Sequence, residues 1–136
     1  MDNHELILLV DELRALPKEN EYVEFKSGDV TTNDKFGQYI SAISNAACIN
    51  NQAFGYLVFG VNNQTHDVEG TNYKFKNKKE GNQELELWVR NLIHPSVKFQ
   101  FYSCQHGKYY LEIFKIPAAV GEPTHFKKIP YIRFDS

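Results

Sequence analysis

The stretch from Phe36 to Val61 constrains the fold most, because it joins an amphipathic helix directly to the most apolar strand pattern in the chain. Apolar side chains recur there at helical spacing, and small residues widen the stripe so that the helix can pack closely on a sheet. These residues are Phe36, Ile40, Ile43 and Ala47, with Ala42, Ala46 and Cys48 beside them. Asn50 and Asn51 end the helix, since Asn tolerates the left-handed conformation. Residues 54–61 are uncharged and rich in β-branched and aromatic side chains, which predicts a strand covered on both faces.

Two further helices and several shorter strands are predicted from the apolar periodicity of the remaining chain. One helix covers residues 3–15, with Asp2 and Glu5 as a capping box. The other begins after a cap at Asn82 and is closed by Pro95. The strands cover residues 22–26, 97–104, 109–116, 125–127 and 131–134, with a tight turn at 105–108 and Pro130 at a sheet edge. We therefore expect one α+β domain over residues 1–136, with a mixed or antiparallel sheet of about five to six strands packed with two to three helices.

Length and composition narrow the class of protein. The 136 residues are enough for one hydrophobic core, and contents of 42% hydrophobic and 24% charged residues are typical of globular domains. No apolar run reaches the length of a membrane span and no signal-peptide pattern opens the chain, so no membrane partner is expected. Two cysteines, Cys48 and Cys104, suit a reducing compartment, and we expect a cytoplasmic protein.

Charge is distributed unevenly along the chain. The net charge of −2 by itself argues against strong binding to a polyanion. Residues 1–24, however, hold seven acidic and two basic residues, so that residues 25–136 carry a balance of +3. Within this second part, the loop of residues 71–81 places Lys74, Lys76, Lys78 and Lys79 around Tyr73 and Phe75. Two interpretations of this loop stay open: a solvated insertion, or an arm that contacts phosphates while its aromatic rings stack on bases.

An acidic cluster precedes the first predicted strand. Glu19, Glu21 and Glu24 fall within six residues, and Lys26 shares a face with Glu24 if this segment is extended. Such carboxylates could hold a divalent metal for phosphodiester cleavage, or could simply form an acidic loop. The five histidines have no metal-ligand spacing, and phosphate-loop and nucleophile motifs are absent. We therefore expect no metal site and no cofactor outside the nuclease alternative.

An ordered series of short motifs resembles one known family. It comprises E-N-E-Y-V-E-F-K from Glu19 to Lys26, I-S-A-I-S-N-A from Ile40 to Ala46, G-Y-L-V-F-G-V from Gly55 to Val61, V-E-G at Val68–Gly70, I-H-P at Ile93–Pro95 and P-Y-I-R at Pro130–Arg133. Over about residues 17–136 the chain is similar to the Schlafen-type AlbA-like domain, described as a DNA-binding module at the N-terminus of bacterial transcriptional regulators. The resemblance implies an α+β fold whose sheet carries nucleic-acid contacts. It also implies that an ATPase-like segment and further C-terminal domains follow in the same protein.

The Schlafen branch of this family has an endoribonuclease site made of three carboxylates. Glu19 and Glu24 match two of them, but Asn62 and Asn63 stand where the third acid usually lies. A neutral amide lacks the charge that a metal ion or an attacking water needs there. Asp67 could replace the third acid only if its loop folds back, so catalysis by this chain is not the leading expectation.

The leading expectation is a nucleic-acid-binding domain of a bacterial transcriptional regulator, with DNA favoured over RNA. Phosphate contacts are expected from Lys26, Lys127, Lys128 and Arg133, with Lys74, Lys76, Lys78 and Lys79 on a mobile arm. One alternative is a metal-dependent endoribonuclease that uses Glu19, Glu24 and, if the loop allows, Asp67. The other is an oligomerisation or docking module, for instance a homodimer, that uses the apolar strand of residues 109–116 and the acidic first helix.

Overall fold

The computed structural model describes residues 1–17, 20–28 and 31–132, and within them the α+β class is confirmed. The helices are α1 (Asn3–Arg14), α2 (Asn33–Ile49) and α3 (Leu85–Leu92), with a short 3-10 helix η1 (Phe75–Asn77). The main sheet contains β1 (Val23–Lys26), β2 (Phe54–Phe59), β7 (Tyr109–Pro117) and β6 (Gln100–His106), in that order. Two small sheets contain β3 (Lys79–Glu80) with β4 (Gln83–Glu84), and β5 (Ile93–His94) with β8 (His125–Phe126) and β9 (Ile129–Pro130).

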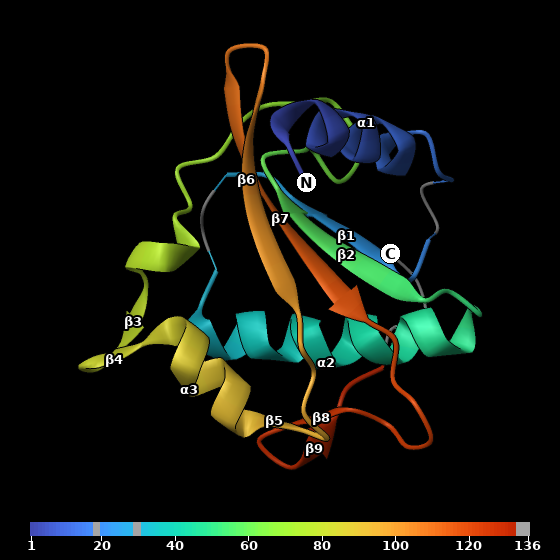
Figure 1. The fold of residues 1–136 in the computed structure, drawn as a ribbon, viewed down its shortest axis with the longest axis vertical. Helices are drawn as coiled ribbons and strands as arrows, with labels where there is room; N and C mark the ends of the chain where they lie inside the picture. Colours follow the sequence, from blue (N-terminus) through green and yellow to red (C-terminus); the bar gives the residue numbers. More distant parts are fainter. Residues whose placement is uncertain (18–19, 29–30, 133–136) are drawn as a thin grey trace.

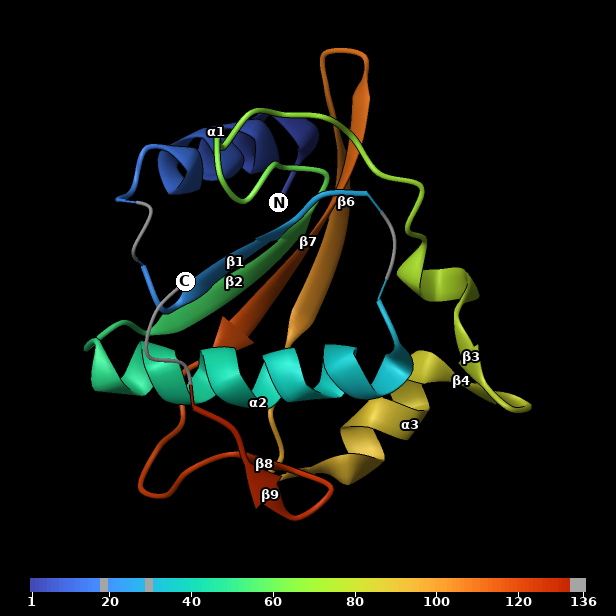
Figure 2. The same ribbon diagram turned by 180° about the vertical axis from the view of Figure 1, so that it is seen from behind.

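The main sheet is mixed and lies between two helices. β1 pairs in parallel with β2, while β2, β7 and β6 pair antiparallel. α1 packs on one side of this sheet and α2 crosses the other (Figure 1; Figure 2 shows the reverse view). Because β7 is a central strand, the expectation that residues 109–116 form a docking surface is wrong: both of its edges are already paired.

The helix and strand predicted within residues 36–61 are confirmed. Apolar side chains of α2 are fully buried against Leu57 and Phe59 of β2, whereas Val58 faces the core on the α1 side, so that β2 is covered on both faces. Asn51 adopts the left-handed conformation expected after the helix, with φ of 57°. Cys48 is an exception, because its side chain is exposed and does not belong to the buried stripe.

The first helix begins as predicted, and the third does not. Asp2 and Glu5 form a complete capping box at the start of α1. The predicted cap at Asn82 is wrong, because the chain turns there between β3 and β4, and α3 begins after Glu84. Of the helices in the described ranges, none combines the length and apolarity that crossing a membrane requires.

A buried polar cluster attaches the last described segment to α2. The Asn45 amide donates to the carbonyl oxygens of Thr124 and Tyr131 and accepts from the Thr124 N–H, at 2.7 to 3.0 Å. The Ser41 hydroxyl donates to the Thr124 carbonyl at 2.7 Å and accepts from the Tyr131 N–H at 3.2 Å. The last strand is β9 at Ile129–Pro130, an edge strand as Pro130 suggests, rather than a strand beginning at residue 131. Residues 133–136 lie outside the described ranges.

Candidate functional site

The side chains of β1 alternate between the two faces of the sheet. Val23 and Phe25 pack in the core beneath α1, which places Glu24 and Lys26 together on the opposite, α2-facing side, as predicted. The Lys26 ammonium group donates to the Tyr39 hydroxyl of α2 at 3.1 Å and lies 5.2 Å from the centre of its ring. Lys26 is thereby held beside the N-terminal half of α2.

Two other lysines, distant in sequence, reach the start of the same helix. The Asn33 amide donates to the Lys79 carbonyl oxygen at 2.9 Å. The next residue, Asp34, accepts a 2.7 Å ion pair from the ammonium group of Lys127, which also lies over the Trp88 ring. Lys127 belongs to the turn between β8 and β9, which Figure 1 shows below α2.

We call these cations the basic strip: Lys26, Lys35, Lys79 and Lys127. Lys35 is an exposed residue on the solvent side of α2, between the positions that contact Lys26 and Lys127. The sequence analysis missed Lys35, although its place on the polar face of a predicted helix was a usable signal. Lys128 is exposed next to Lys127, while Arg133 lies outside the described residues.

The segment of residues 71–84 differs from the predicted arm. It runs along the outside of the sheet from the β6–β7 hairpin to the start of α2 (Figure 1). Tyr73 and Phe75 are 1% and 2% exposed, and Tyr73 stacks on Phe59 with a ring separation of 4.1 Å. The prediction that these rings stack on bases is therefore wrong, because they belong to the core. Lys74, Lys76 and Lys79 are exposed and Lys78 is half-buried, so the lysine side chains, and not the two rings, reach the solvent from this segment.

Lys74 lies beside a buried carboxylate. Its ammonium group is 3.4 Å from the centre of the Tyr110 ring, and the Tyr110 hydroxyl donates a short hydrogen bond to Glu112. Glu112 is 7% exposed and also accepts from the Phe75 N–H at 3.0 Å. Burial, together with the neighbouring Glu112, raises the pKa of Tyr110 to about 12. Lys74 thus lies over an aromatic ring whose hydroxyl group is bonded to a carboxylate, and it is not part of the cations around α2.

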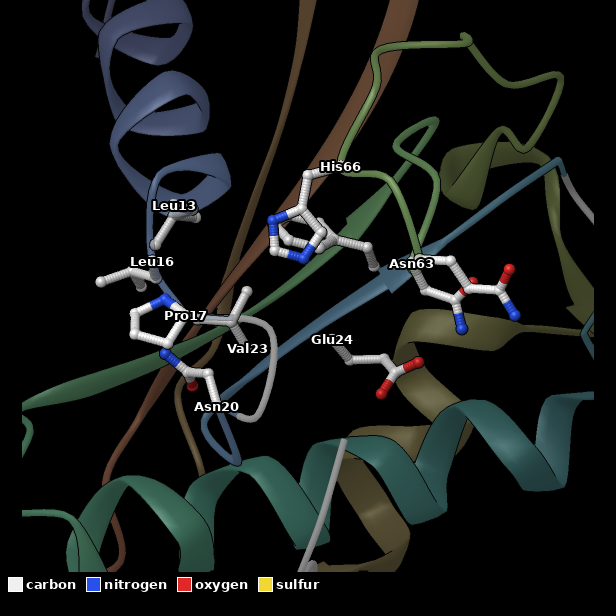
Figure 3. Close-up of a pocket in the computed structure, with 10 residues that line it drawn as sticks. Leu13, Leu16, Pro17, Asn20, Val23, Glu24, Asn63 and His66 are labelled. Carbon is white, nitrogen blue, oxygen red and sulfur yellow. The ribbon is translucent and has the colours of Figure 1, made fainter.

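A depression of about 380 Å³ lies between the end of α1, β1 and the turn of residues 62–67 (Figure 3). Glu24 is at its rim, with its carboxylate directed toward α2 and away from His66. Asn63 lines the depression, whereas Asp67 does not, so the structure does not bring Asp67 to Glu24 there. Glu19 lies outside the described residues. Among the residues with described positions, no three His, Cys, Asp or Glu side chains form a group able to hold a metal ion.

His66 lines this depression, although its place in the sequence gave no signal. It has a φ of 65°, a conformation unusual for a residue other than glycine, and is 9% exposed. Its Nδ1 atom lies 2.8 Å from the Arg14 carbonyl oxygen, and its ring meets Phe25 edge-on at 4.7 Å. The Asn62 side chain accepts from two backbone N–H groups of the turn, which fixes the turn that carries His66.

This combination of fold and motif order defines an AlbA-like α+β domain. The chain belongs to the Schlafen, AlbA_2 family, whose model matches residues 19–136. It matches no curated protein significantly.

Two solved structures share the fold. The N-terminal domain of a RecG-related protein from Nitrosomonas europaea is similar with a TM-score of 0.58 and 18% identity, over 100% of this chain and 91% of that one. The DIP2311 protein from Corynebacterium diphtheriae is similar with a TM-score of 0.51 and 15% identity, over 91% of this chain. This chain spans 24% of the DIP2311 chain, so the same fold occurs there as one part of a longer protein.

Proposed function

We propose that this domain binds nucleic acid through phosphate contacts made by the basic strip. The observation that carries the proposal is the meeting of Lys26, Lys79 and Lys127, from three separate segments, around the first half of α2. The ammonium groups of Lys26 and Lys127 contact side chains of α2, whereas Lys79 is held there through its backbone carbonyl. The membership in the AlbA_2 family and the RecG-related neighbour support the same class of function.

The charges of the strip make the expected binding weak and sensitive to salt. Asp34 pairs with Lys127, and the whole chain carries a net charge of −2. Lysine contacts to phosphate position a nucleic acid without reading its sequence. We propose DNA as the ligand and a bacterial transcriptional regulator as the setting, with sequence selectivity supplied by other domains.

The endoribonuclease alternative has less support. Glu24 is the single carboxylate among the described residues that line the depression, and amides occupy the place of the third acid. Cleavage by a divalent metal usually needs more than one charged oxygen ligand.

The test is a titration of fluorescent DNA at several salt concentrations, followed by anisotropy. The variant Lys26→Gln with Lys127→Gln removes one cation from each side of α2. The matched control, Lys108→Gln with Lys115→Gln, removes the same net charge from the β6–β7 turn and from β7. We expect the strip variant to lower the salt slope by about 2, since each phosphate contact adds roughly 0.9, and the control to change it little. Equal effects of both variants would show that only net charge matters, and the absence of binding at low salt would refute the proposal.

A further inference from the structure

We infer that the depression beside His66 receives one unpaired nucleobase of the bound nucleic acid. The inference rests on the proposed function and adds a ligand class to it. It depends on the depression itself, on the tautomer of His66 and on the chemical nature of the walls.

His66 presents a hydrogen-bond acceptor to the depression. The partner of Nδ1 is the carbonyl oxygen of Arg14, which can only accept, so Nδ1 carries the proton. In the neutral ring Nε2 then keeps its lone pair. Within the described residues Nε2 has no hydrogen-bond partner, and this atom is open to the depression although His66 as a whole is only 9% exposed. An accessible acceptor in the wall of a depression can accept a hydrogen bond from a ligand that carries an N–H group.

The walls fit a flat, uncharged ring better than a phosphate. Leu16, Pro17 and Val23 provide apolar surface, while Asn63 and Gln64 provide amides that can both donate and accept. No Lys or Arg is found among the described residues that line it, so these residues offer no cationic partner to a phosphate. The volume of about 380 Å³ lies within the range of small-molecule sites.

The depression lies next to the basic strip, so that one nucleotide can place its phosphate on the strip and its base in the depression. Lys26 follows Glu24 by two residues on the same face of β1, which is roughly 7 Å along an extended strand. A phosphate held at Lys26 would therefore place its neighbouring base near the rim of the depression. A base in a duplex has its hydrogen-bonding edge engaged by its partner, so the site selects unpaired bases.

The experiment compares three probes at one salt concentration: a single-stranded DNA octamer, the same octamer with abasic sites at every position, and a duplex of equal length. The abasic octamer keeps every phosphate but offers no base. We expect the octamer with bases to bind the unmodified domain about tenfold more tightly than the abasic one, which corresponds to one base contact. Equal affinity for the two octamers would overturn the inference and leave phosphate binding intact, whereas no binding of any probe would overturn the proposed function itself.

Two variants locate the effect. His66→Asn keeps a donor for the Arg14 carbonyl and a residue type that tolerates positive φ, but it removes Nε2. Asn63→Trp fills the depression from an exposed position on the turn. We expect both variants to lose the preference for the octamer with bases and to keep the affinity for the abasic octamer. The matched control His94→Asn, at an exposed position of β5 directly after α3, should keep the full preference. A preference that survives in both variants would place the base elsewhere and overturn the inference.

Discussion

Replacing Asn45 by Ala tests whether the buried polar cluster holds the last described segment on α2. Asn45 is 4% exposed and makes three hydrogen bonds, two to carbonyl oxygens of Thr124 and Tyr131 and one from the Thr124 N–H. Alanine would leave all three backbone groups without this partner. The loss of a buried hydrogen bond usually costs on the order of 1 kcal/mol of stability, and more when the remaining group stays dry.

The expected loss of unfolding free energy is therefore about 3 kcal/mol, reduced by roughly 0.5 kcal/mol because Ala has the higher helix propensity. A net loss of about 2.5 kcal/mol is a large fraction of the stability of a typical domain. The measurement is urea denaturation followed by circular dichroism, with the midpoint and the slope fitted separately.

Asn91→Ala is the matched control, because Asn91 is an exposed residue of α3 and gains the same helix propensity. It should change stability by less than about 0.5 kcal/mol. Asn45→Asp is a second variant: it keeps the acceptor for the Thr124 N–H but turns a carboxylate oxygen toward two carbonyls. The two carbonyl oxygens raise the pKa of the new carboxyl group. The loss of stability in Asn45→Asp should therefore shrink as the pH falls and the carboxyl takes up a proton. A loss below about 1 kcal/mol in Asn45→Ala would refute the role given to this cluster.

Three further predictions concern other parts of the fold. Partial burial acts to raise the pKa of Asp11, but hydrogen bonds from His106 and Arg14 outweigh it and hold the pKa below 3.8. Asp11→Asn should therefore lower the thermal midpoint at pH 7. The difference in thermal midpoint between the variant and the unmodified protein should disappear as the pH falls below the pKa of Asp11, because the carboxyl is then protonated. Burial, and secondly Asp11, raises the pKa of Cys104 to about 11, so a thiol reagent at pH 8 should modify only the exposed Cys48 in the native protein, and rapid labelling in Cys48→Ser would contradict this. Gly55→Ala would place a Cβ atom 2.7 Å from the Tyr22 carbonyl oxygen and in collision with an Ile43 methyl group. A loss of about 1–3 kcal/mol in urea denaturation is expected, and an unchanged midpoint would show that α2 moves away at little cost.

The sequence by itself determined the elements whose causes are local. The capping box at Asp2, the apolar stripe from Phe36 to Ile43 and the uncharged strand that follows were all predicted, because spacing and side-chain chemistry over a few residues decide them. Motif order also indicated the AlbA-like family, which the match over residues 19–136 confirms.

Only the tertiary structure decided where the functional side chains lie. Tyr73 and Phe75 were predicted as exposed rings, yet packing against Phe59 and Phe114 places them in the core, a contact between segments that no local pattern reports. Lys26, Lys79 and Lys127 are far apart in the chain and meet only because β1, β3 and the β8–β9 turn all adjoin α2. The acceptor at His66 Nε2 likewise depends on a carbonyl 52 residues away, since the proton on one ring nitrogen is set by what the fold brings to it.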